Sequence, residues 1–510
     1  MPRSIALLLV IVVAFVAFGQ VSVPWGGYAN DPQHTAQALT GAQPLSEIHW
    51  SLPVDLNPPG GGSGDLLIHY GSPMVTAANT VLLPVKTGSS SGFEVMAVNG
   101  ATGALLYTLT TDYTLPPHNW VPPYGPVLTS GNRVYYAGAG GTVYYRDSVD
   151  SPTGPNGSSG ASGQIAFYGN SLYAKRKSIF DRTVQISTPL TADSAGNVYF
   201  GFRVHGANPA KLISGIARIS ASGVGTWVSA ASAAGGDTSI TGVELNCSPA
   251  LSNNQQTIYI AVSNGASDGA GYLASLQSST LAPLARVQLM DPRGGPATLS
   301  SDSSAAPMVG PDGDVYYGVL EYPCCSSHND RGWLLHFDST LAVVKTPGSF
   351  GWDDTASVVP AFAVPSYTGG SSYLVLTKYN NYKGTGTGDG VNKVAVLDPN
   401  ASQQDEYSTT PVSVMKEVIT VTGVTSDASP GFPNAVKEWC INSAVIDASN
   451  KAAIINSEDG VVYHWDFTSN SLTASLRLTA GRGEAYTPTA VGVDGTAFAI
   501  NDAILFAVGK

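Results

Sequence analysis

Five oxygen-bearing side chains in this sequence could hold a cation or move a proton. Glu244, Asn246 and Asp302 offer hard oxygen atoms, the ligands that Ca²⁺ prefers, and are candidate metal ligands. Asp353 and Asp354 are adjacent, so their repulsion could raise the pKa of one of them and suit it to act as a general base. The alternative for all five is that they cap turns and bond neighbouring backbone groups.

The four cysteines offer two candidate disulfide bridges. Cys324 and Cys325 are adjacent and could close a vicinal disulfide ring, which an oxidising compartment would preserve. Cys247 and Cys440 could form a second bridge only if their Cα atoms lie within about 7 Å, and the alternative is two buried thiols. The eight histidines show no paired zinc spacing, and no Gly-x-Ser-x-Gly motif or phosphate loop occurs.

Composition predicts an all-β protein. Glycine (57) and proline (33) are scattered through the 510 residues, which is typical of many short strands joined by turns. The net charge of -12 disfavours a nucleic-acid partner, because nucleic acid requires a basic face.

Residues 1–19 have the pattern of a signal peptide, with Arg3 before an apolar run and small residues before Gln20. We therefore expect a secreted protein, extracellular or periplasmic; an uncleaved anchor is the alternative. No later segment has membrane-spanning length without Gly, Pro or charge, so we expect no membrane span.

A repeated unit then organises residues 20–510 into a single domain. Each unit begins with a small or polar residue, usually followed by Pro, before an apolar strand. A turn and a second strand rich in β-branched and aromatic residues follow, then two further strands. The eight strand starts are at Pro73, Pro126, Pro189, Pro249, Pro307, Pro360, Ser443 and Pro488.

Four antiparallel strands repeated around a ring make a β-propeller, here of eight blades. The last unit has three strands, so Ile48 to Leu52 is expected to pair beside Ala503 to Val508 and close the ring; Trp50 and Leu52 would face the neighbouring blade. If that segment instead joins the first blade, the count is seven. Two segments, about 147–181 and 380–438, exceed what the strands need and are expected to be long surface loops.

This architecture places many functional side chains on one face. The loops that precede the inner strands and those that join the second and third strands open on the same side, so we predict a ligand site there. The predicted face carries His69, Tyr70, His118, Trp120, Arg182, Trp352, Tyr379, Trp439, Arg482, Glu484 and Tyr486.

Two segments resemble the pyrroloquinoline-quinone (PQQ) repeat propellers, the quinoprotein alcohol dehydrogenase-like superfamily. Trp25 to Thr35 is similar to the N-terminal Trp, Asp and His/Asn-Thr signature of that superfamily, and Ala97 to Tyr107 is similar to its Ala-x-Asp-x-x-Thr-Gly-x-x-x-Trp blade motif, with Asn99 and Tyr107 substituted. Other blades lose the motif: 396–400 keeps only Asp398, and 337–340 stops before the Gly and Trp.

The resemblance implies the propeller fold and leaves two hypotheses for function. The first is a secreted binding or scaffold propeller without catalysis, which holds a small molecule, a glycan or a protein on the channel face. The alternative is an alcohol or sugar dehydrogenase that uses PQQ and calcium. In it Asp353 or Asp354 would be the base, Glu244, Asn246 and Asp302 would hold Ca²⁺, and the Cys324–Cys325 ring would contact the quinone. A hydrolase or lyase is a third reading, supported only by the acidic and histidine-bearing loops.

Overall fold

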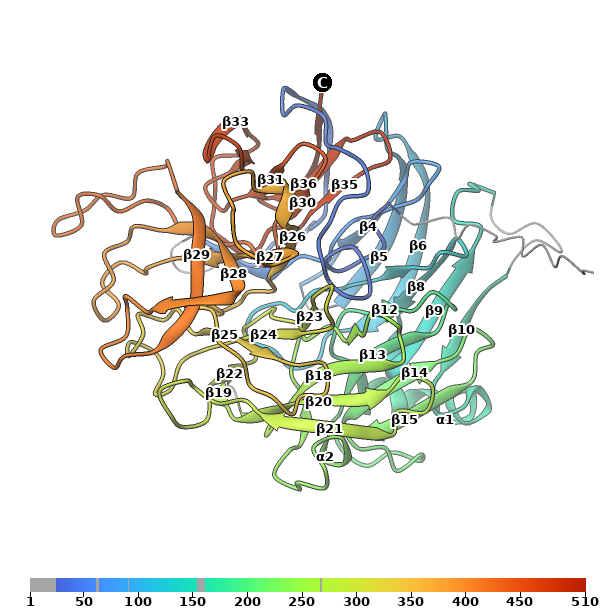
Figure 1. Cartoon of the computed structure of the whole chain (residues 1–510). Helices are drawn as coiled ribbons and strands as arrows, with labels where there is room; N and C mark the ends of the chain where they lie inside the picture. Colours follow the sequence, from blue (N-terminus) through green and yellow to red (C-terminus); the bar gives the residue numbers. More distant parts are fainter. Residues whose placement is uncertain (1–23, 61–63, 90, 154–160, 267) are drawn as a thin grey trace, which may run out of the picture.

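Eight antiparallel sheets follow one another around a ring in chain order, so the colours of Figure 1 run around the molecule from blue to red. The structure is a computed structural model that describes residues 24–510 except 61–63, 90, 154–160 and 267; the predicted signal peptide lies outside these ranges. The prediction of an eight-bladed all-β propeller is confirmed.

The first four blades run from the inner to the outer strand. The first blade has β3 (Met74–Val75), β4 (Thr80–Lys86), β5 (Ser91–Asn99) and β6 (Leu105–Thr114), and the second has β7 (Val127–Leu128), β8 (Arg133–Ala137), β9 (Thr142–Asp147) and β10 (Ser162–Ala166). The third blade has β11 (Val184–Ile186) and β12 (Thr191–Ala192), both beside β13 (Val198–Val204), with β14 (Gly215–Ile219) and β15 (Gly225–Ser229). The fourth has β16 (Gly242–Val243) and β17 (Ala250–Leu251), both beside β18 (Thr257–Ser263), with β20 (Gly271–Gln277) and β21 (Pro283–Gln288).

The last four blades repeat this order. The fifth blade has β23 (Met308–Val309), β24 (Val315–Val319) and β25 (Trp333–Phe337), and the sixth has β26 (Ser357–Pro360), β27 (Tyr373–Tyr379), β28 (Lys393–Gln404) and β29 (Ser413–Thr422). The seventh blade has β30 (Val445–Asp447), β31 (Ala452–Asn456), β32 (Val461–Asp466) and β33 (Ser471–Arg477). The eighth has β35 (Thr489–Val491), β36 (Ala497–Asn501), β37 (Ile504–Gly509) and β1 (Glu47–Pro53). In the fifth blade, bridges from Phe337 to Val344 and from Leu334 to Gly348 stand in place of a regular outer strand.

Short elements connect the blades. Two small ladders pair β2 (Leu66–His69) in parallel with β34 (Glu484–Tyr486), and β19 (Asp268–Gly269) with β22 (Leu299–Ser300). The helical segments are α1 (Asn170–Thr183), α2 (Ala230–Ala233), η1 (Ala139–Gly141) and η2 (Ala361–Ala363). No helix within the described ranges is long and apolar enough to cross a membrane.

The N-terminal strand closes the ring as predicted. β1 pairs antiparallel with β37, which joins segments more than 450 residues apart in the sequence. Trp50 and Leu52 are half-buried while His49 and Ser51 are exposed, so the alternation also matches. The Trp50 ring lies 5.8 Å from that of Phe498, and its indole N–H donates to the carbonyl of Gly100 in the first blade at 2.9 Å.

The two segments expected to be long loops are only partly loops. Residues 147–181 contain β10 and most of α1, and residues 380–438 contain β28 and β29. Outer strands of a blade are half-exposed and therefore polar, so their composition resembles that of a loop. For this reason the sequence predicted loops where the structure has these strands.

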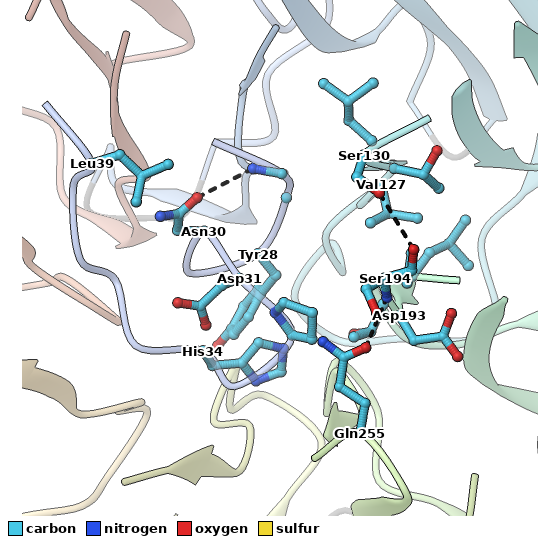
Figure 2. A pocket seen from close by; sticks show the side chains of 18 residues that line it. Tyr28, Asn30, Asp31, His34, Leu39, Val127, Ser130, Asp193, Ser194 and Gln255 are labelled. Atoms are coloured by element: carbon cyan, nitrogen blue, oxygen red, sulfur yellow. Dashed lines mark hydrogen bonds between the residues drawn. The ribbon is translucent and has the colours of Figure 1, made fainter. Parts of the chain in front are cut away.

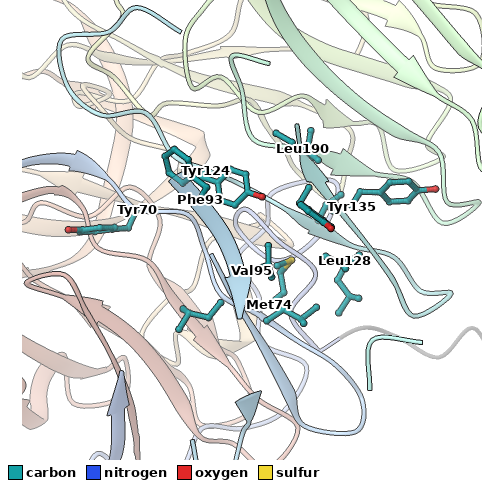
Figure 3. Close-up of a cluster of buried hydrophobic side chains, with 14 of the residues drawn as sticks. Tyr70, Met74, Phe93, Val95, Tyr124, Leu128, Tyr135 and Leu190 are labelled. Atoms are coloured by element: carbon teal, nitrogen blue, oxygen red, sulfur yellow. The ribbon is translucent and has the colours of Figure 1, made fainter. Parts of the chain in front are cut away.

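Apolar side chains fill the spaces between neighbouring blades. Met74, Val95 and Phe93 of the first blade pack towards Leu128 of the second, in a cluster that continues to Leu190 of the third (Figure 3). The rings of Phe93 and Tyr124 lie 4.8 Å apart. Burial of these large side chains, at about 25 cal/mol per Å² of apolar surface, is the main force that holds the blades together.

Residues 25–38, which we call the N-terminal plug, run across one end of the central channel. Their backbone hydrogen bonds to the inner strands of six blades, through Val75, Leu128, Leu251, Val309, Val358 and Ile446. The phenol of Tyr28 donates to the carbonyl of Ser304 at 2.7 Å and also lies 2.8 Å from Thr355 Oγ1. A pocket of about 240 Å³ remains between the plug and the second and third blades (Figure 2).

Candidate functional site

Asp353 is at the centre of a buried polar network above the N-terminal plug. Its Oδ1 accepts from the backbone N–H of Ser304 at 2.6 Å and from the Ser304 hydroxyl at 2.5 Å. Lys378 Nζ lies 3.7 Å from Asp353 Oδ2, and His69 Nε2 lies 4.0 Å from Oδ1. Tyr28 connects this network to the plug, because Ser304 and Tyr28 both bond Asn442.

His69 belongs to this network as a neutral base. Burial lowers its pKa, and the nearby charge of Asp353 opposes that shift only in part. Its Nε2 has no hydrogen-bond partner in the structure. His69 therefore presents an unsatisfied ring nitrogen beside a carboxylate and an ammonium group.

Asp354 has a different environment from Asp353. It is buried, and its Oδ2 accepts from Thr377 Oγ1 at 2.5 Å. Burial raises its pKa to about 7, whereas repulsion from Asp353 is the weakest of the named causes. Asp354 thus has the raised pKa that was expected of one of the pair, but burial contributes more to it than repulsion from Asp353 does.

The three candidate metal ligands all carry unsatisfied oxygens. Both carboxylate oxygens of Glu244, Oδ1 of Asn246 and Oδ1 of Asp302 are buried without a partner. Asn246 Nδ2 donates to the carbonyl of Ser303 at 3.0 Å, and Asn119 donates to Asp302 Oδ2 at 2.9 Å.

Within the described residues, Glu244 and Asp302 belong to no group of three close cysteine, histidine or acidic side chains. Arg203 is the cation whose charge acts on Glu244, whereas Asp302 acts on His69. Among the described residues, the one group of three cysteine, histidine or acidic side chains with ligand atoms within 4.8 Å is Cys324, Cys325 and Asp330. Glu244 and Asp302 therefore lie in no acidic cluster of this kind, and no calcium ion is assigned to them.

One of the two candidate disulfides is present in the structure. Cys324 and Cys325 form the vicinal disulfide, in an exposed loop between β24 and β25. Cys247 and Cys440 are free thiols, so the second bridge is not formed. Burial raises the pKa of the Cys247 thiol to about 12, which keeps it protonated and unreactive.

A cavity of about 800 Å³ opens on the predicted face, over the first, seventh and eighth blades. Trp120, Arg482 and Glu484 of the predicted set line it, as does Cys440. The further charged residues that line it are Asp65, Lys437, Glu438, Glu458, Asp459 and Arg477.

Two of the lining carboxyl groups are kept partly protonated. Burial raises the pKa of Glu484 to about 8, and its Oε2 has no partner while Oε1 accepts from the N–H of Asp502. Burial and the charge of Glu438 raise the pKa of Glu458 to about 8. The cavity thus holds carboxyl groups that can donate or accept a proton near neutral pH.

The other predicted face residues are dispersed. Tyr379 and Trp439 are in the core, and Arg331 stacks on the Tyr379 ring at 4.4 Å. Tyr70 bonds Asp55, and Tyr486 lies 3.4 Å from Ser72 Oγ. The remaining three are His118, which bonds the carbonyl of Pro116, Trp352, which is half-buried against a core cluster, and Arg182, which is exposed on α1.

Asp65 and Glu458 are cavity residues that the sequence analysis missed. Glu458 lies in the loop that joins the second and third strands of its blade, so the loop rule that selected the other face residues would have found it. Asp65 directly precedes β2, a short strand outside the blade repeat, and carried no such signal.

Comparison with known proteins places the fold. No family model matches the chain, and no curated protein matches its sequence. A europium-containing methanol dehydrogenase superposes with a TM-score of 0.56 at 11% identity, over 93% of this chain and 89% of the other. A quinohemoprotein alcohol dehydrogenase from Comamonas testosteroni gives 0.54 at 12% identity, over 97% and 82%, and one from Pseudomonas putida HK5 gives 0.50 at 12%, over 98% and 78%.

The chain therefore has the β-propeller fold of these alcohol dehydrogenases, which is the fold that the sequence resemblance implied.

Proposed function

We propose that this protein is a secreted propeller that binds a small polar ligand on its loop face, in the cavity over the first, seventh and eighth blades. The observation that carries the proposal is the cavity itself: about 800 Å³ in volume, with Glu484 buried at its wall and one oxygen without a partner. A buried polar atom without a partner costs about 1–3 kcal/mol, and a ligand that bonds it would recover that free energy. The N-terminal sequence pattern supports secretion.

A screen of purified protein by thermal unfolding tests this proposal. The compounds are neutral polyols, organic anions, organic amines, and PQQ with calcium. We expect at least one class to raise Tm, with the shift lost in Glu484→Gln. If no class raises Tm, or if every shift persists in that variant, the cavity is not the ligand site.

The dehydrogenase is the second candidate. The unsatisfied oxygens of Glu244, Asn246 and Asp302 favour it, because three side chains selected as possible ligands all bury such atoms. Against it, Glu244 and Asp302 belong to no group of three close acidic, histidine or cysteine side chains in the part of the chain that the structure describes. Dye-reducing activity after reconstitution with PQQ and calcium, and its loss in Asp302→Asn, would establish this function; a reconstituted protein without such activity would exclude it.

A further inference from the structure

The 800 Å³ cavity, which we call the acidic cavity, is lined by more carboxyl groups than cationic groups. Five carboxyl groups and three cationic side chains line it. The cationic groups already have partners: Lys437 pairs with Asp427 at 3.2 Å, Arg482 with Asp502 at 3.4 Å, and Arg477 donates to backbone carbonyls. Asp427 and Asp502 lie outside the lining, although the charge of Lys437 also acts on Glu438 and Glu458.

Three of the lining carboxyl groups occupy two places on the cavity wall. Glu438 and Glu458 come from the loops around the seventh blade, and the charge of Glu438 raises the pKa of Glu458, while Lys378 and Lys437 act on Glu438. Glu484 begins β34, beside β2, and its buried Oε2 has no hydrogen-bond partner. The half-buried Trp120 supplies an aromatic ring to the same lining, and an aromatic face attracts an organic cation.

We propose that the acidic cavity binds an organic cation with at least two ammonium groups, one held by Glu484 and the other by Glu438 and Glu458. This inference rests on the proposed function and names the class of its ligand. A cavity of this volume fits a multi-atom ligand, whereas a bare metal ion needs several ligand atoms within bonding distance of one point. An ammonium group donates three hydrogen bonds and so satisfies carboxylates that a neutral hydroxyl compound cannot neutralise.

Binding of such a cation should release protons. Glu458 and Glu484 are largely protonated at pH 7, and a bound ammonium group favours their ionised forms and lowers their pKa values. Up to two protons per ligand should therefore be released at pH 7 and fewer at pH 9. The groups that act on these two carboxyls are Asp65, Lys437, Glu438 and Cys440 around Glu458, and Asp55, Tyr70, Arg482 and Asp502 around Glu484.

Isothermal titration calorimetry with 1,4-diaminobutane and spermidine tests the proposal, with 1,4-butanediol and calcium chloride as controls. We expect the amines to bind, butanediol and calcium to bind at least tenfold more weakly, and the apparent enthalpy to depend on the buffer in the sense of proton release. Glu484→Gln and Glu458→Gln should each weaken amine binding at least tenfold. Glu47→Gln, at an exposed site on β1 outside the lining, should leave it unchanged.

Several outcomes would overturn the inference. Equal binding of butanediol, amine binding that both glutamine variants retain, or the absence of proton release would each contradict it. If the amines fail while another class in the thermal screen binds through Glu484, this inference falls and the proposed function stands. If nothing binds, both fall. Circular dichroism of each variant establishes that a loss of binding is not a loss of folding.

Discussion

The two ends of the channel differ in how fully their polar groups are hydrogen-bonded. At the plugged end, residues 25–38 pair with six inner strands, and the Tyr28 hydroxyl has three hydrogen-bond partners. At the loop end, His69 and Glu484 bury polar atoms without partners, and carboxyl groups gather at the cost of raised pKa values. The plug also buries Trp25 Nε1 and His34 Nε2 without partners. The comparison therefore teaches that one end stabilises the ring through its backbone pairing, whereas the other retains an unsatisfied carboxyl oxygen that a ligand can use.

Deletion of residues 20–55 should have the largest effect. It removes both the N-terminal plug and β1, so the last blade loses its outer strand and the ring keeps an unpaired edge. We expect aggregation in size-exclusion chromatography with light scattering, while a chain that begins at residue 20 stays soluble. A truncated protein that remained monomeric with an unchanged Tm would show that the N-terminal strand does not close the ring.

Trp50→Ala should weaken the closure without removing it. The half-buried indole packs against Phe498 and Gly103 and bonds Gly100, so its loss should cost about 2–3 kcal/mol in urea unfolding. His49→Ala, at the exposed neighbouring position, is the control and should cost less than about 0.5 kcal/mol. Equal costs for the two variants would contradict the packing of β1 against the first blade.

Tyr28→Phe tests the plug at a single atom. Without the hydroxyl, the Ser304 carbonyl and the side chains of Thr355 and Asn442 lose a buried partner, at a cost of about 1–3 kcal/mol. Tyr322→Phe, at an exposed tyrosine, should leave the unfolding free energy unchanged. A neutral Tyr28→Phe substitution would mean that the plug does not depend on this contact.

Arg182→Ala should have the smallest effect. The side chain is exposed on α1, outside the acidic cavity, although its sequence position had assigned it to the ligand face. We expect a stability change within about 0.5 kcal/mol and unchanged ligand affinity. A tenfold loss of affinity would show that the binding site extends to the third blade.

The sequence predicted the fold well because the repeat is local. Seven of the eight inner strands begin within two residues after the predicted start, whereas β26 in the sixth blade ends at Pro360 and η2 follows it. Trp50 and Leu52 alternate with His49 and Ser51 as a strand of the closing blade requires. The outer strands β10 and β29 escaped prediction because partly exposed strands share the composition of loops, and the second half of the third strand β28 is likewise polar and partly exposed.

The site was predicted only in part. The position of a loop identifies the face of the propeller on which a residue lies, but it does not show whether its side chain lines a cavity or is buried in the core. Trp120, Arg482 and Glu484 line the acidic cavity, but Tyr379 lies in the core under Arg331. Which side chain of a loop turns inward depends on packing between blades, and such contacts join residues far apart in the sequence. The unsatisfied oxygen of Glu484 is likewise a property of the assembled ring.

The division between the two ends is tested most directly by comparing Tyr28→Phe with Glu484→Gln in urea unfolding at pH 9. The pKa of Glu484 rises from its usual range to about 8 on folding, so native stability falls as pH rises from about 4.5 to above 8. At pH 9, Glu484→Gln should therefore stabilise the protein, by on the order of 3 kcal/mol, and this gain should vanish near pH 4. Tyr28→Phe should destabilise the protein at both pH values. Opposite signs at pH 9 are the predicted result, and destabilisation by both substitutions would contradict the account.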